Sequence, residues 1–179
     1  MINVYIQKWN KENTPWQSIL SEILKKDYHI EDMPIILRDE FGKPYFQNGK
    51  LQFNVSHSGE YLVIAVSESA VGVDIQGPKS IKDGMYLKVV QPKEQSFIGE
   101  NREKDFLRLW TLKESFVKAE GKGLRIPLAD YWFEKEEDQY FVNYGGQRGS
   151  WTFNIEETLI DGYFISVCGL DDNVQWKMI

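Results

Sequence analysis

The sequence predicts an α+β protein, and three observations support that prediction. Alternating or continuous apolar runs, typical of strands, occupy both ends of the chain. Two segments, residues 15–28 and 102–120, repeat apolar residues at helical spacing. The strand-like and helical segments follow one another irregularly and are separated by turns rich in glycine and proline, as expected when helices and strands share one sheet-based fold.

Composition sets the limits of what the protein can be. The 179 residues suffice for one sizeable core or two small halves that share one, and 42% of them are hydrophobic, which excludes a disordered chain. The single cysteine, Cys168, excludes an internal disulfide. The longest apolar run covers six residues, 61–66, and no signal-peptide pattern is present, so we expect a cytoplasmic protein with no membrane partner.

Charge is distributed unevenly along the chain. The net charge of −6 argues against a general nucleic-acid binder. Residues 79–125 nevertheless hold eleven Lys or Arg against seven Asp or Glu. A basic segment in an acidic protein indicates an anionic ligand or an acidic partner surface, although a solvated helix face would give the same pattern.

The first part of the chain predicts a strand, a helix and a set of short strands. Residues 2–9 alternate as a strand does, and residues 15–28 have helical spacing. Residues 34–69 read as short strands between glycine-containing turns. Within them, Asn48-Gly49 between two such runs predicts a hairpin.

The second part predicts a strand over residues 70–77, then helices interrupted near Pro92 and Gly99. The main helix runs from about 102 to 120, with glycines suited to ending it. Its expected buried stripe comprises Phe106, Leu109, Trp110, Phe116 and Val117. The tail returns to strands over 130–135, 139–144, 151–157 and 161–170.

A faint internal repeat divides the chain. Residues 53–55 precede an apolar strand at 61–67, and residues 153–155 precede a similar one at 163–169. We therefore expect two α+β halves, residues 1–70 and 71–179, that share an interface, with chance similarity between hairpins as the alternative.

Four short segments carry polar groups that a core does not require. Gly42-Lys43-Pro44 is a turn holding a lysine, and Ser56 and His57 end a strand, where they suit phosphate oxygens. The alternatives are an ordinary Gly/Pro turn for the first segment, and a turn-capping serine beside a surface histidine for the second.

The other two segments suggest a cation site. Asp74 and Gln76 are two apart on a strand and share a face, where their oxygens suit a hard cation such as Mg²⁺. Glu114 and Lys118 are neighbours on the main helix, so Glu114 would complete the site and Lys118 would face a bridged phosphate. A half-solvated strand face and a plain Glu–Lys pair are the alternatives.

In this order the four segments resemble the motifs of the 4′-phosphopantetheinyl transferases, in particular the larger monomeric type. Gly42-Lys43-Pro44 is followed by "NVSHS" at 54–58, "GVDIQ" at 72–76 and "WTLKESFVK" at 110–118. The resemblance extends over roughly residues 36–168. It implies a monomeric pseudo-dimer of two α+β halves that moves 4′-phosphopantetheine from coenzyme A to a serine of a carrier protein.

The resemblance also implies roles for individual residues. Asp74, Glu114 and Gln76 match the magnesium ligands, and Lys118 matches a pyrophosphate contact that also serves catalysis. Glu94 matches an acid thought to activate the carrier serine. Asp74 and Lys118 also match contacts to coenzyme A. The remaining matches are further coenzyme A contacts: Gly42, Lys43, Pro44, Ser56 and His57. His57 would also stabilise developing charge in the reaction.

Two departures from the family pattern matter. Gln76 replaces a second acid, so magnesium affinity should fall. The chain also reaches its Gly-Lys-Pro turn early, and a basic helix that helps anchor coenzyme A has no clear counterpart; Lys25, Lys26 and Arg38 are possible substitutes. These departures motivate a rival from another class, a weakened module that binds coenzyme A or a carrier protein without transferring anything.

Overall fold

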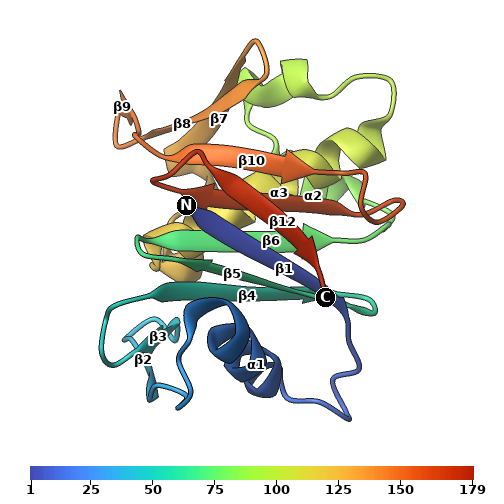
Figure 1. Cartoon of the computed structure of the whole chain (residues 1–179). Coiled ribbons are helices and arrows are strands. Elements are labelled where there is room, and N and C mark those ends of the chain that lie inside the picture. The colour runs from blue at the N-terminus through green and yellow to red at the C-terminus, as the bar shows by residue number, and fades with distance from the viewer.

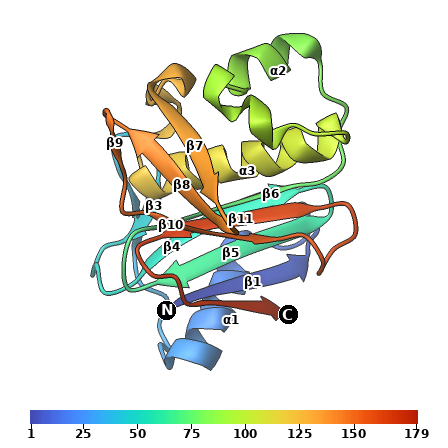
Figure 2. The same ribbon diagram turned by 90° about the horizontal axis from the view of Figure 1, so that it is seen from above.

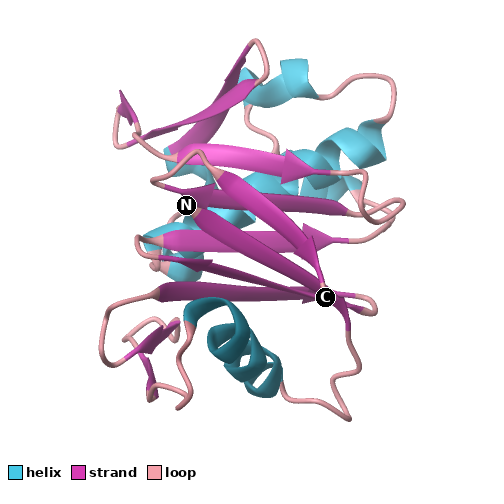
Figure 3. Ribbon diagram, in the orientation of Figure 1, coloured by secondary structure: helices cyan, strands magenta, loops and turns pink.

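The computed structural model describes the backbone of residues 1–179 and every side chain except that of Leu124. Two main sheets lie between helices (Figure 1, Figure 3), which confirms the expected α+β class. One sheet has the strand order β12-β1-β5-β4 and the other has the order β10-β11-β6. Their strands are β1 (Ile2–Lys8), β4 (Gln52–Ser58), β5 (Tyr61–Ser67), β6 (Val71–Gln76), β10 (Thr152–Glu156), β11 (Phe164–Gly169) and β12 (Val174–Met178).

The two sheets repeat one connectivity. In the first, β1 leads to helix α1 (Trp16–Tyr28) and then to the β4–β5 hairpin; in the second, β6 leads to helix α3 (Arg102–Glu120) and then to β10 and β11. Each opening strand pairs antiparallel with the closing strand of its own unit. The internal repeat of the sequence lies at equivalent places, in β4–β5 and β10–β11. This arrangement is consistent with a pseudo-dimer.

The proposed division at residue 70 falls between β5 and β6, and it stays a prediction. One strand crosses it, because β12 leaves the second half and pairs in parallel with β1 of the first. The two halves also share a core of small branched side chains from both sheets, among them Val4, Val63, Val73 and Val167. The expected common interface is therefore present.

The two long helices lie on opposite sides of the sheets (Figure 2). Helix α1 packs on the outer face of the first sheet, where Leu20 and Leu24 meet Phe53 and Ile64. Helix α3 packs on β6 and β11. Its other side is covered by two strands, β7 (Tyr131–Glu136) and β8 (Gln139–Tyr144), and by the segment of α2 (Asp83–Val89) and the 3₁₀ helix η1 (Pro92–Phe97).

Helix α3 has the bounds that the sequence predicts. The Asn101 side chain accepts a hydrogen bond from the Lys104 amide at its start, and Gly121 ends it in the left-handed conformation with φ of 77°. Its buried surface is wider than the expected stripe, because the β7–β8 hairpin covers the side that a surface helix would expose. Leu107, Leu112 and Lys113 are therefore buried as well, whereas Trp110 is only half-buried.

The hairpin expected at Asn48-Gly49 is a turn without a strand ladder. Gly49 donates its amide to Phe46, but the strands on either side pair elsewhere. Strand β3 (Pro44–Phe46) pairs with β2 (Ile36–Arg38), and β4 pairs with β5. Residue type predicted the turn correctly, but which strands pair depends on contacts distant in the sequence.

Among the described helices, none is both long and apolar enough to cross a membrane.

Close contact between α3 and β6 depends on Gly72. A Cβ atom at this position would overlap the Ser115 carbonyl oxygen and the Ala119 amide nitrogen of α3. Both atoms belong to the helix backbone, so neither can turn aside. The functional groups on α3 and β6 can therefore meet only while residue 72 lacks a side chain.

We expect Gly72→Ala to lower the free energy of unfolding by about 2–3 kcal/mol, because overlap with a helix backbone forces the helix away from the sheet. Urea denaturation would measure the change. The control is Gly84→Ala in α2, where an added Cβ meets nothing within 4 Å. Equal stability of the two variants would contradict the close contact.

Candidate functional site

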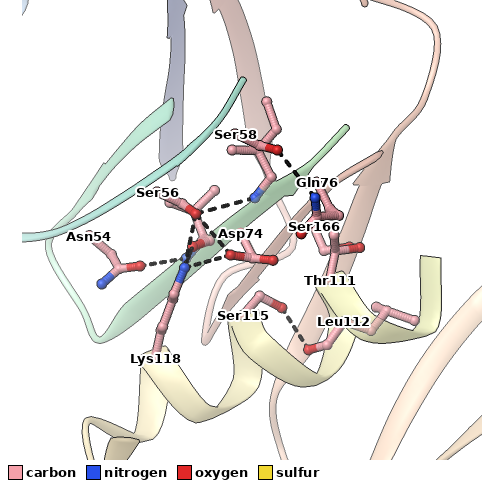
Figure 4. A network of polar contacts seen from close by, with 12 residues as sticks. Asn54, Ser56, Ser58, Asp74, Gln76, Thr111, Leu112, Ser115, Lys118 and Ser166 are labelled. Atoms are coloured by element: carbon pink, nitrogen blue, oxygen red, sulfur yellow. Dashed lines mark hydrogen bonds and ion pairs between the residues drawn. The ribbon is translucent and has the colours of Figure 1, made fainter. Parts of the chain in front are cut away.

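The site lies where β4 of the first half meets β6 of the second (Figure 4). Within the described backbone, the two strands are not joined by backbone–backbone hydrogen bonds. Instead, every second side chain of β4 from Asn54 to Ser58 accepts a hydrogen bond from a backbone amide of β6 or of the residue that follows it. Asn54 Oδ1 accepts the Val73 amide at 2.9 Å, and Ser58 Oγ accepts the Gly77 amide at 3.0 Å. Between them, Ser56 Oγ accepts a longer bond from the Ile75 amide at 3.4 Å. We call Asn54, Ser56 and Ser58 the polar seam.

Ser56 also belongs to a charged cluster with Asp74 and Lys118. Lys118 Nζ lies 2.6 Å from Asp74 Oδ1, and it donates to Ser56 Oγ at 3.0 Å and to the Val73 carbonyl at 3.1 Å. The Ser56 hydroxyl in turn donates to Asp74 Oδ1 at 2.8 Å. Three elements, β4, β6 and α3, thus supply one cluster, which Figure 4 shows between the strands and the helix.

Only one oxygen of Asp74 takes part in these bonds. Asp74 is 6% exposed, and the two bonds to its side chain both end on Oδ1. A buried carboxylate needs a partner for its charge, and Lys118 is that partner here. The Oδ2 atom remains available to a ligand.

Glu114 adds a second carboxylate within electrostatic reach of the first. Burial and, after it, the negative charge of Asp74 raise the pKa of Glu114 above its usual value, while Lys118 opposes this shift. Asp74 and Glu114 therefore act on one another electrostatically, while their convergence on one cation stays a prediction. One ammonium group faces two acids at this point, an excess of negative charge that a bound cation would balance.

Gln76 presents an amide at the end of β6. Its Nε2 donates to Ser58 Oγ at 3.2 Å and to the Gly77 carbonyl at 3.3 Å. Both bonds use the nitrogen and orient the side chain, leaving the carbonyl oxygen for a ligand. Gln76 is half-buried, on the same face of β6 as Asp74.

The structure describes no group of three His, Cys, Asp or Glu side chains that could hold a metal, the Leu124 side chain being outside the described part. The available donor set is instead two carboxylates and an amide, from Asp74, Glu114 and Gln76. Hard oxygen donors of this kind fit Mg²⁺, which commonly keeps only one or two protein carboxylates. The residues present are therefore compatible with a magnesium ion.

The Gly-Lys-Pro turn meets the end of α3 and forms one wall of a groove of about 230 Å³. Lys43 crosses to the other half, where its ammonium donates to the Ala119 carbonyl at 3.1 Å. Burial lowers the pKa of Lys43, while Asp39 and, to a smaller extent, Cys168 and Glu120 oppose the shift. The groove joins several expected residues to the charged cluster and is lined by Phe41, Gly42, Lys43, Pro44, Asn54, Val117, Lys118, Gly121 and Gly123.

His57 does not share a face with Ser56. Adjacent strand residues point to opposite sides, so His57 is exposed and packs against Trp9, with 5.3 Å between the ring centroids. Its role toward coenzyme A stays a prediction.

Glu94 has different partners from those expected of a proton acceptor. It is 0% exposed, and its carboxylate lies 2.9 Å from the ammonium of Lys113, itself 1% exposed. Burial lowers the pKa of Lys113, and Glu94 opposes this shift. The pair lies inside the core of the second half, with no opening toward solvent at Glu94.

Sequence reasoning missed three residues that build the site. Asn54 and Ser58 hold the seam, and Lys113 is the partner of Glu94. The signal for the first two was the period of two in "NVSHS", which places Asn54, Ser56 and Ser58 on one face. Nothing in the spacing of the main helix distinguishes Lys113 from a surface lysine.

Comparison with known proteins gives consistent results. The family model described as the 4′-phosphopantetheinyl transferase superfamily matches residues 70–168. The chain is 32% identical over 169 residues to the 4′-phosphopantetheinyl transferase gsp of Aneurinibacillus migulanus, covering 89% of this chain and 70% of that protein. It is 29% identical over 126 residues to the 4′-phosphopantetheinyl transferase Sfp of Bacillus subtilis, covering 67% and 56%.

A more distant organism gives a similar match. The chain is 31% identical over 182 residues to the L-aminoadipate-semialdehyde dehydrogenase-phosphopantetheinyl transferase of Xenopus laevis, covering 85% of this chain and 54% of that protein. The chain thus spans little more than half the length of Sfp and of the Xenopus protein.

The seam predicts a stability effect at Asn54. We expect Asn54→Ala to lower the free energy of unfolding by about 1–3 kcal/mol, because the buried Val73 amide loses its acceptor. Chemical denaturation would measure this change, with the exposed Asn13→Ala as the control. A loss no larger than that of Asn13→Ala would mean that the seam bond contributes nothing.

Proposed function

The chain belongs to the 4′-phosphopantetheinyl transferase superfamily, and we propose that it moves 4′-phosphopantetheine from coenzyme A to a serine of an acyl or peptidyl carrier protein, with Mg²⁺ as cofactor. The observation that carries this proposal is the cluster of Asp74, Lys118 and Ser56 at one end of the groove that Gly42, Lys43 and Pro44 line. The groove and the cluster together present two ammonium groups, of Lys43 and Lys118, and a serine hydroxyl, of Ser56. Such groups can bind the charged oxygens of a pyrophosphate.

Coenzyme A would lie along this groove, with its pyrophosphate at Lys118. This lysine is the counter-ion of Asp74, and 26% of its side chain is exposed. A phosphate in the groove would give the same ammonium a second anionic partner. Lys118 would then stabilise charge on the oxygen that leaves the phosphorus.

In the proposed reaction the carrier serine oxygen forms a bond to the β-phosphorus of coenzyme A. The bond from that phosphorus to the bridging oxygen breaks, the proton of the serine hydroxyl passes to solvent water, and adenosine 3′,5′-bisphosphate leaves. Asp74, Glu114 and Gln76 would hold magnesium, which would neutralise pyrophosphate charge when bound. The hydrogen bonds from Gln76 to Ser58 and Gly77 keep its amide aligned with the two acids.

The carrier protein would dock beside the end of β6. The segment that follows, residues 79–104, carries exposed lysines at positions 79, 82, 88 and 104. Carrier helices rich in acid would be attracted to such a surface, and the attraction would weaken with salt. We expect the protein to act as a monomer, because both halves of the pseudo-dimer are present in one chain.

The proposal predicts a specific mass change. Incubating the chain with an apo carrier protein, coenzyme A and Mg²⁺ should add one phosphopantetheine group to the carrier, as measured by mass spectrometry. Glu114→Gln should slow this transfer by roughly 100-fold or more, because it removes a charged group from the reacting centre. The control is Glu103→Gln, an exposed glutamate in the first turn of the same helix.

A rival function is favoured by Gln76, which lacks the charge of an acid. A weakened module would bind coenzyme A or a carrier protein and transfer nothing. Measurable binding of coenzyme A with no mass increment over a panel of apo carriers would support this rival and contradict the transferase.

Gln76 also gives a prediction about the metal. We expect Gln76→Glu to lower the magnesium concentration for half-maximal rate by roughly threefold to tenfold, because an added charge near the ion strengthens its binding. Titration of the transfer rate with Mg²⁺ would measure this shift. The exposed Gln139→Glu changes the net charge equally and should have no effect. If Gln76→Glu needs the same or a higher magnesium concentration for half-maximal rate, Gln76 does not contact the ion.

A further inference from the structure

A buried ion pair lies on the side of α3 that faces away from the polar seam. Glu94 of η1 and Lys113 of α3 are 2.9 Å apart, at 0% and 1% exposure. The ammonium approaches the carboxylate without the alignment of a hydrogen bond, and it also lies 4.8 Å from the centre of the Tyr131 ring. A buried charge pair is costly to form and is a poor source of stability, so its presence calls for another explanation.

The Glu94 carboxylate connects three segments. Its Oε1 accepts the Phe133 amide of β7 at 2.8 Å, and its Oε2 accepts the Gln91 amide at the start of η1 at 2.9 Å. The same Oε2 contacts Lys113 of α3. Both oxygens are therefore occupied by protein, and the side chain has no surface through which a carrier serine could reach it.

Lys113 directly precedes Glu114, and this adjacency links the pair to the site. Successive helix residues differ by about 100° around the axis, so fixing Lys113 toward η1 fixes the direction of Glu114. On the opposite side, Thr111 Oγ1 contacts Ser166 Oγ of β11 at 2.7 Å, and Lys118 contacts Asp74. These contacts hold α3 from two sides, and they are directional, because each joins one atom of the helix to one partner atom of a neighbouring element.

We propose that Glu94 and Lys113 are positioning residues whose ion pair sets the rotation of α3 and so directs the Glu114 carboxylate toward Asp74. The proposal rests on the transferase function above and assigns Glu94 no part in accepting the serine proton. It also explains why the carboxylate is enclosed: a positioning group needs fixed partners, whereas a proton acceptor needs access to substrate or to a water that reaches it.

The two roles predict opposite outcomes in a double-mutant cycle. Lys113→Met leaves Glu94 buried without its counter-charge, and we expect kcat to fall about 10- to 100-fold through misplacement of Glu114. Glu94→Gln alone leaves Lys113 unpaired and should also reduce kcat. The double variant Glu94→Gln with Lys113→Met removes both charges and keeps an acceptor for the Phe133 amide, so it should be several-fold more active than Lys113→Met.

A catalytic Glu94 would reverse that order. Since the double variant lacks the carboxylate, it would then be no more active than Lys113→Met, and that result would overturn the proposal. A double variant that shows no folded state in thermal melting would overturn it as well. KM for coenzyme A should stay within about twofold of wild type in the double variant, because the Gly-Lys-Pro groove lies on the other side of α3.

A second measurement does not depend on turnover. Calorimetric titration with Mg²⁺ should show weaker binding in Lys113→Met than in both wild type and the double variant, because the affinity follows the direction of Glu114. If the wild-type chain transfers nothing, the proposed function fails, and this order of magnesium affinities still tests the positioning role. Equal affinities in all the variants would overturn it.

Discussion

The hydrogen bonds from the amides of β6 to the side chains of β4 are the constraint on which the rest of the structure depends. Two edge strands that met through their backbones would leave no room for polar side chains between them. Here Asn54, Ser56 and Ser58 satisfy the amides instead and hold β6 one side-chain length away. That spacing joins the two halves and brings Ser56 into contact with Asp74 and Lys118, so the interface and the site are built from the same bonds.

Helix α3 contacts the sheet through small residues, and it forms ion pairs through the lysines beside that contact surface. Gly72 lets the helix backbone approach β6, while Thr111 and Ser115 replace larger apolar groups at the contact. Polar contacts at Thr111, Lys113 and Lys118 add directional bonds to this packing, and two of them place charge inside a small protein.

Local features of the fold could be predicted from the sequence, whereas partners distant in the chain could not. The bounds of α3 follow from Asn101 and Gly121, which act on their own neighbours. Asp74 and Lys118 were expected at one site, with Lys118 facing a phosphate, whereas in the structure Lys118 lies 2.6 Å from Asp74 as its counter-ion. The burial of Glu94 and the separate faces of Ser56 and His57 were missed, the first because Lys113 looks like any surface lysine, the second because a contiguous motif was taken as one contact surface. The same limit explains Asn48-Gly49, where the turn forms but tertiary contacts decide the pairing.

The electrostatics of the site indicate what kind of ligand completes it. Asp74 and Glu114 are both buried enough to influence one another, yet Lys118 is the single cation bonded to this pair among the described side chains. A third acid in place of Gln76 would add uncompensated negative charge to the site, and this charge would lower the free energy of unfolding. An amide keeps an oxygen donor in place without the repulsion. Under the proposed function, Gln76 would therefore reduce repulsion within the site at the expense of cation affinity, which would suit a phosphate ligand that brings its own cation.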